Sequence, residues 1–141
     1  DAVLETFDRI LRALTLAVGG IAAISLAVAG ILIMNVMLIA VTQRRKEIGL
    51  LKAIGATGAQ IRAAFFTEAV MLALGGAILG LVVGKLGQVA IGQAFPDIPF
   101  TAPWWAVIAA PLTAIVTSVL FTVVPAKRAA LLDPVMALSK R

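Results

Sequence analysis

The chain has 141 residues, of which 62% are hydrophobic and 13% are charged, and its formal net charge is +5. So much apolar surface exceeds what one small soluble core can bury, and the composition is typical of a membrane protein. Cysteine and histidine are both absent, which excludes disulfides, thiolate nucleophiles, imidazole bases and the common zinc sites. Basic residues cluster beside apolar runs, so we expect a membrane surface rather than nucleic acid as their partner.

The first apolar segment carries no charge from residue 13 to 43, which exceeds the roughly 20 residues that a helix needs to cross the hydrocarbon core. A helix continuing back to about Val3 would be ~60 Å long, roughly twice the ~30 Å hydrocarbon thickness. We therefore predict an external stalk over 1–12 that is continuous with a membrane helix over 13–43. An amphipathic segment lying flat on the outer leaflet is the alternative. The helical spacing before the span comes from Val3, Leu4, Phe7, Ile10, Leu11 and Leu14.

A second membrane helix is predicted over 58–92. Glu68 and Lys85 border its uncharged part, and we expect them near opposite interfaces, where long side chains reach polar surroundings. A short external loop over 93–103, with three prolines, follows this helix.

The third membrane helix is predicted over 104–125, with Trp104 and Trp105 as an aromatic anchor at its start. Pro125 marks a helix boundary or a kink. A cytoplasmic tail over 126–141 follows, in which Asp133 and Pro134 match an N-cap and a first helical position. None of the three spans has buried charges or an obvious polar row, which favours force transmission over a hydrophilic transport path.

The distribution of Lys and Arg predicts the orientation, because short cytoplasmic loops carry an excess of basic residues. The segment from 44 to 62 has five and the tail has four, whereas the amino-terminal segment has two and the stretch from 85 to 103 has one. The fold class is therefore an all-α membrane protein with three transmembrane helices, an external amino terminus and a cytoplasmic carboxyl terminus. Acidic residues stand where a secretory signal would need basic ones, so we expect the chain to begin in mid-protein.

The cytoplasmic connection over 44–57 is predicted to form an elbow. From Arg44 to Ile54 the spacing puts Ile48, Leu51 and Ile54 on one face with basic residues around it, typical of an amphipathic helix at a membrane surface. Gly55 is expected to end this helix in a left-handed conformation. Thr57 and Gln60 match a capping box that opens the next helix at Gly58.

Two features of the spans indicate helix packing. Gly76, Gly80 and Gly84 recur every fourth residue, which lets another helix approach closely. Asn35 is the strongly polar group deep in the first span, and we expect its amide to form a hydrogen bond across helices. The alternatives are ordinary membrane-helix glycines and a substrate-binding asparagine.

Three separated segments resemble the carboxyl-terminal half of FtsX-like permeases of ABC transporters, and the MacB branch most closely: NVMLIAVTQRRKEIGLLKAIGATGAQI, FFTEA and PAKRAALLDPVMAL. The resemblance implies a permease of four membrane helices, of which this chain matches the last three. It also implies a preceding helix and a large extracytoplasmic domain, and a location in the bacterial cytoplasmic (inner) membrane.

The resemblance further implies partners and site residues. The partners are an ABC ATPase subunit or fused nucleotide-binding domain, which would hold ATP and Mg, a second permease copy or paralogue, membrane lipid and a periplasmic adaptor. This chain has no phosphate-binding loop of its own, so it is not expected to be an enzyme or to bind a cofactor. The tail motif contributes Pro125, Arg128, Asp133 and Pro134. The ATPase-coupling residues implied are Arg44, Arg45, Lys46, Glu47, Ile48, Leu51, Lys52, Ile54 and Gly55.

The function expected is mechanical coupling, in which ATP hydrolysis by the partner moves the elbow and the long first helix carries the motion to the external side for substrate export. One alternative is a transmembrane signalling or regulatory subunit that controls an external enzyme. Another is a membrane scaffold without an ATPase, whose basic elbow contacts anionic lipid.

Overall fold

The computed structural model describes residues 1–99 and 101–139 and consists of helices and their connections. Phe100, Lys140 and Arg141 lie outside the described residues, and so does the end of the predicted tail. Three helices are long and apolar enough to cross a membrane, which confirms the all-helical prediction with three candidate spans. The elements are α1 (Ala2–Gln43), α2 (Arg45–Ala53), α3 (Gly58–Ala94), α4 (Trp104–Ala130) and α5 (Pro134–Ser139).

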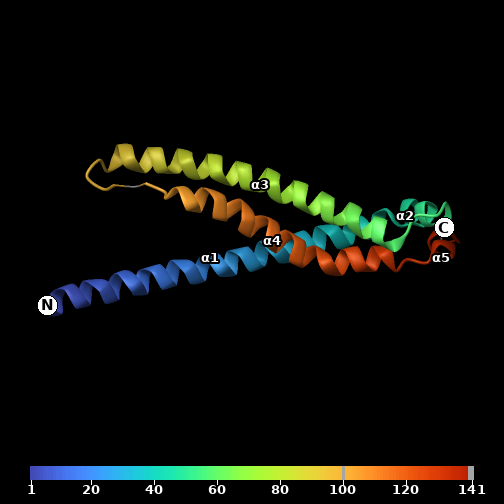
Figure 1. The fold of residues 1–141 in the computed structure, drawn as a ribbon, viewed down its shortest axis with the longest axis horizontal. Coiled ribbons are helices and arrows are strands. Elements are labelled where there is room, and N and C mark those ends of the chain that lie inside the picture. Colours follow the sequence, from blue (N-terminus) through green and yellow to red (C-terminus); the bar gives the residue numbers. More distant parts are fainter. Residues whose placement is uncertain (100, 140–141) are drawn as a thin grey trace.

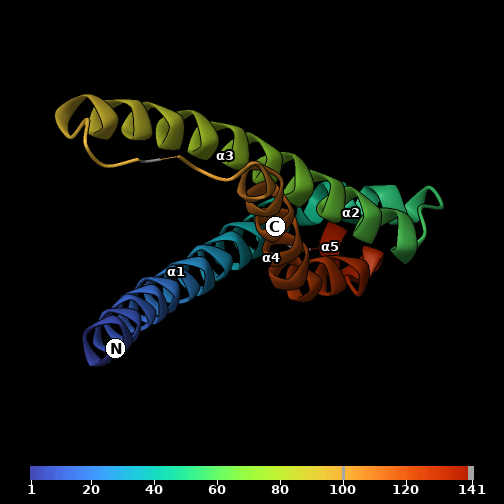
Figure 2. The ribbon, with the colours of Figure 1, turned by 60° about the vertical axis from the view of Figure 1, so that its left-hand side comes forward.

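The first helix is unbroken, so the stalk and the first span are one element. Its amino-terminal half stands clear of the other helices in both views (Figures 1 and 2), and its buried residues, Gly30, Met37 and Val41, all lie in the second half. A separate segment lying on the membrane surface would require a break between residues 1–12 and the remainder of α1, and the helix has none. Whether these residues stand outside the membrane stays a prediction.

Helix α4 lies between α1 and α3 and contacts both (Figure 1). Small residues at the crossings permit close approach, as in other membrane helix pairs. Gly30 of α1 faces the ring of Phe121. Three residues before Phe121 on α4, the fully buried Ser118 donates a hydrogen bond from its hydroxyl to the carbonyl of Ala69 in α3, at 2.9 Å.

The boundary predicted at Pro125 is wrong, because α4 continues through it to Ala130. Proline removes one backbone donor from a helix, but a helix buried among neighbours tolerates that loss, and Pro125 is fully buried. Helix α4 changes direction along its length in Figures 1 and 2, and a kink at Pro125 itself stays a prediction. The second helix likewise ends at Ala94, slightly beyond the predicted 92.

Helices α2 and α5 pack against each other at one end of the molecule, where the three long helices converge (Figure 1). A cluster of buried apolar side chains fills this end and joins α1, α2, α3 and α4. Its members are Met37, Val41, Ile48, Ile61, Phe65, Ala69, Ala126 and Ala129.

Candidate functional site

The elbow is rigid because its connections are short and capped. Arg44 alone separates α1 from α2, with Arg44 N–H donating to Ala40 at the end of α1 and Ile48 N–H donating to Arg44 at the start of α2. The two helices are distinct, but no flexible linker lies between them.

The carboxyl end of α2 is capped as predicted. Gly55 has φ +109°, a conformation that glycine adopts without steric cost. The N–H groups of Gly55 and Ala56 donate to the carbonyls of Lys52 and Leu51, the paired bonds of a Schellman motif. Thr57 and Gln60 then form the predicted capping box at the start of α3.

One face of α2 points into the protein. Ile48 is 4% exposed and belongs to the buried cluster. The ammonium of Lys52 donates hydrogen bonds to the carbonyl of Ala130 and, at 2.7 Å, to the carbonyl of Leu132. Ala130 is the last residue of α4, where helix carbonyls lack intrahelical partners and favour positive charge, and Leu132 lies in the connection that follows it. Lys52 thus ties the elbow to α4.

The opposite face of α2 is exposed and apolar. Leu51 is 47% exposed and Ile54 is 75% exposed, and Leu50 is also exposed. The prediction that Ile48, Leu51 and Ile54 share one face is therefore wrong, because Ile48 turns into the buried cluster. We call the exposed residues Leu50, Leu51 and Ile54 the outer face of α2.

Charged residues surround the outer face. Arg45, Lys46 and Glu47 are exposed. Arg44 forms an ion pair with Glu68 of α3, with 3.3 Å between Nη1 and Oε2. Both side chains are well exposed, so this pair contributes little to stability; it does link the elbow to α3.

The tail residues take distinct positions. Asp133 caps α5 as predicted, with its Oδ1 accepting a hydrogen bond from Val135 N–H at 2.9 Å. Pro134 begins that helix and is half-buried, whereas Arg128 is exposed on the last turn of α4. Pro125 is buried and so cannot contact a partner directly.

Among the described residues, no other helix touches the positions predicted for helix packing. An added Cβ at Gly76, Gly80 or Gly84 would meet no atom within 4 Å. Asn35 is exposed on α1, away from α4, and no hydrogen bond joins its amide to another described residue. Packing of another helix at these positions stays a prediction.

Several contacts were missed from sequence. The contacts of Glu68 with Arg44, of Ser118 with Ala69 and of Gly49 with Ala137 were not predicted. Hydroxyl residues at 118 and 122 are four apart on the third span, however, and this spacing signals a polar strip. The expectation of no polar row therefore needs correction. Both hydroxyls are satisfied, since Thr122 donates to the carbonyl of Ser118 at 2.6 Å and Ser118 donates to Ala69, so they serve packing.

Gly49 permits the contact between α2 and α5. An added Cβ there would lie 2.8 Å from the Cβ of Ala137, closer than packed carbons tolerate. Replacing Gly49 with alanine is expected to destabilise the pair of helices by about 1–3 kcal/mol. The loss would be measured as a lower melting temperature in detergent and faster protease cleavage near residue 133. Adding Ala137→Gly should restore part of the stability, and no recovery would contradict the direct contact.

Three long apolar helices joined through a compact elbow define this chain as part of a multi-pass helical membrane protein. The sequence model of the family described as FtsX-like permease C-terminal matches residues 19–134. The chain belongs to the FtsX-like permease family and is of the MacB type. Its location is accordingly the inner membrane.

Several curated proteins are similar over nearly the whole chain. A Bacillus subtilis protein, "Uncharacterized ABC transporter permease YknZ", is 40% identical over 138 residues, which are 98% of this chain and 34% of YknZ. The pyoverdine export ATP-binding/permease protein PvdT of Pseudomonas entomophila is 42% identical over 98% of this chain and 21% of PvdT. The macrolide export ATP-binding/permease protein MacB of Acinetobacter baylyi is 38% identical over 99% of this chain and 21% of MacB. The chain thus spans about a third of YknZ and about a fifth of PvdT and MacB.

Proposed function

We propose that this chain is the force-transmitting membrane part of a MacB-like ABC exporter. An ABC ATPase, either a separate subunit or a fused domain, docks on the outer face of α2. ATP and Mg²⁺ reside in that ATPase. The printed names of PvdT and MacB, each an export ATP-binding/permease protein, support an export role for the whole protein.

The single-residue junction between α2 and α1 is the observation that carries the proposal. Helix α1 is stiff because its backbone hydrogen bonds run continuously along its own length. A displacement of α2 pulls on the end of α1 through the single residue Arg44, and the exposed amino-terminal half of α1 is free to move with it. The orientation predicted from the basic residues puts that half on the external side.

Contacts on the inner face of α2 keep the elbow from moving alone. Ile48 holds α2 in the buried cluster, and Lys52 holds it to the end of α4. A load on the outer face therefore reaches the whole bundle instead of bending one short helix. The exposed apolar side chains of the outer face, ringed by charged ones, suit a protein partner.

A second permease copy is the proposed partner of Asn35. Asn35 lies nine residues before Arg44, about 14 Å deeper along the helix and so near the bilayer centre. An amide there is costly without a hydrogen-bond partner, and one asparagine can both donate to and accept from another. Contact between two α1 helices would satisfy both amides.

The docking proposal predicts that Leu51→Asp combined with Ile54→Asp abolishes ATPase recruitment. Two carboxylates on the outer face would be buried unpaired in the interface, costing several kcal/mol. Because both side chains are exposed in the chain itself, insertion and folding should be unchanged. Co-purification of the complete protein with its ATPase, or the stimulated ATP hydrolysis rate where the domain is fused, measures the effect.

Phe95→Asp is the matched control, since Phe95 is a similarly exposed apolar residue at the opposite end of α3. It should leave ATPase recruitment intact. If the double variant still recruits the ATPase, the outer face of α2 is not the docking surface. If no ABC ATPase associates with the unaltered protein, the scaffold alternative replaces the proposal.

A further inference from the structure

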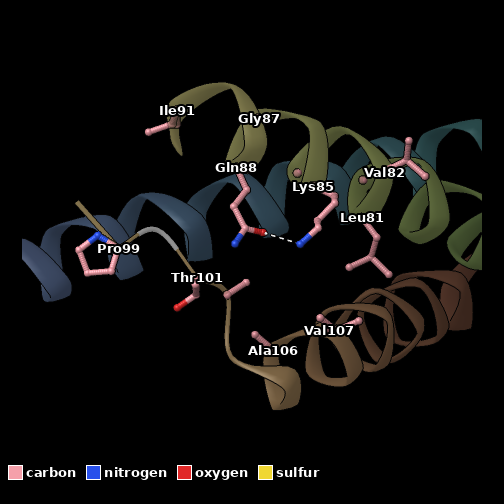
Figure 3. Close-up of a pocket in the computed structure, with 13 residues that line it drawn as sticks. Leu81, Val82, Lys85, Gly87, Gln88, Ile91, Pro99, Thr101, Ala106 and Val107 are labelled. Carbon is pink, nitrogen blue, oxygen red and sulfur yellow. Dashed lines mark hydrogen bonds between the residues drawn. The ribbon is translucent and has the colours of Figure 1, made fainter. Parts of the chain in front are cut away.

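A cavity opens between the second half of α3 and the start of α4, at the end of the bundle remote from the elbow (Figure 3). Its volume is about 860 Å³, within the roughly 300–1,000 Å³ typical of small-ligand sites. Both glycines predicted for helix packing in this region, Gly80 and Gly84, line it, and so does Gly87. The missing side chains leave the space that the cavity occupies.

The polar groups of the cavity gather at one end. The ammonium of Lys85 and the amide of Gln88 point into the space below α3 and are hydrogen-bonded at 3.3 Å (Figure 3). Thr101 lies across from them on the connection to α4. Among the described residues, no carboxylate lies within ion-pair distance of Lys85. The polar end therefore carries an uncompensated positive charge.

The other end of the cavity is apolar. Leu81 and Val107 face it from α3 and α4 (Figure 3). Gly80 is five residues before Lys85, about 7.5 Å further along the helix axis. The cavity thus changes from charged to apolar over a distance similar to that between a lipid headgroup and its first methylenes.

Lys85 also has the depth of a headgroup. It is 23 residues beyond Arg62 on α3, so the two charges are about 35 Å apart along the axis, slightly more than the ~30 Å hydrocarbon core. Trp104 and Trp105 begin α4 next to the cavity residue Ala106, and such tryptophans mark the membrane interface. The ammonium is therefore placed in the headgroup layer of the leaflet opposite the elbow.

We propose that this cavity binds an anionic membrane phospholipid, with its phosphate on Lys85 and one acyl chain along the glycine-lined wall of α3. The phosphate of an anionic lipid keeps its net negative charge, whereas a zwitterionic headgroup offsets it with its own cation, and basic pockets between membrane helices bind anionic headgroups. The acyl chain replaces the side chains that Gly80 and Gly84 lack. The site is separate from the elbow and does not depend on ATPase docking.

Native mass spectrometry of the complete protein, mixed with phosphatidylglycerol or phosphatidylcholine of equal chain length, tests the proposal. Phosphatidylglycerol should be retained about fivefold better, the effect expected of one lysine near a membrane surface. Lys85→Gln should abolish that preference. Gly84→Leu should remove retention of both lipids by filling the cavity, and an added Cβ there meets no atom within 4 Å, so the variant should fold.

Two controls lie outside the cavity. Gly75→Leu places the same side chain on α3 where a Cβ is equally unobstructed, and Lys127→Gln removes an exposed lysine at the other end of α4. Neither should change lipid retention. Equal retention of the two lipids, or a preference that survives Lys85→Gln, would overturn the proposal.

Photo-crosslinking on the unaltered protein gives a second measurement that does not depend on variants. A phosphatidylglycerol with a photoreactive acyl chain should label peptides within 80–91 and 101–107. Absence of label from these segments would sink the proposal. The proposal would also be wrong if Gly84→Leu released a bound protein partner and not lipid, because a helix of that partner would then occupy the cavity.

Discussion

Replacing Gly30 with alanine is expected to force α1 and α4 apart. An added Cβ would lie 2.3 Å, 2.4 Å and 2.7 Å from three ring atoms of Phe121, and no rotation about the methyl group relieves a clash with the ring. The expected loss of stability is about 1–3 kcal/mol, the usual cost of overpacking. The melting temperature of the Gly30→Ala protein in detergent, compared with that of the unaltered protein, measures the loss.

Gly19→Ala is the matched control for this substitution. Gly19 lies on the same helix, and its added Cβ would meet no atom within 4 Å. Since alanine favours a helix over glycine by about 1 kcal/mol, stability should hold or rise slightly. Pairing Gly30→Ala with Phe121→Ala should recover part of the loss; a Gly30→Ala protein as stable as Gly19→Ala would mean that the helices do not cross there.

Removing the charge at Lys52 is expected to uncouple ATP hydrolysis from export. Lys52→Met keeps the length of the side chain but eliminates the charge-assisted bonds to the carbonyls of Ala130 and Leu132, each worth about 1.5–3 kcal/mol when made. The outer face of α2 is untouched, so ATPase recruitment should persist. The ratio of substrate exported to ATP hydrolysed, measured in proteoliposomes, should fall.

Two further variants separate coupling from general damage. Lys127→Met removes an exposed lysine from the last turn of α4 and should leave the export ratio unchanged. Lys52→Arg restores positive charge and donors, with different geometry, and should recover part of the ratio. If Lys52→Met loses ATPase recruitment as well, Lys52 belongs to the docking surface and not to the link with α4.

Much of the helical framework was predictable from local signals. Gly55 ends α2, Thr57 and Gln60 open α3, and Asp133 caps α5, because each effect depends on groups only two to five residues apart. The long apolar runs likewise predicted three helices long enough to cross a membrane. The predicted end at Pro125 failed because a local rule on proline was overridden by burial among neighbouring helices.

The candidate site was predictable only in part. The sequence predicted the short helix between Arg44 and Gly55. It did not distinguish the side chains of this helix that pack against the other helices from those that remain exposed. Lys52 was grouped with the docking residues, yet it bonds to carbonyls 78 and 80 residues away. Nothing within a few residues of Lys52 predicts that contact.

By itself, the sequence determined the three long apolar helices and the capped helix ends at Gly55, Thr57 and Asp133, because capping and apolar length are local properties. The tertiary structure alone decided which apolar faces are buried: Ile48 inside and Ile54 outside on α2, and α4 as the helix between α1 and α3. The physical reason is that lipid tails are as apolar as a protein core. Periodicity therefore cannot distinguish a side chain that faces lipid or a partner from one that packs against a distant helix.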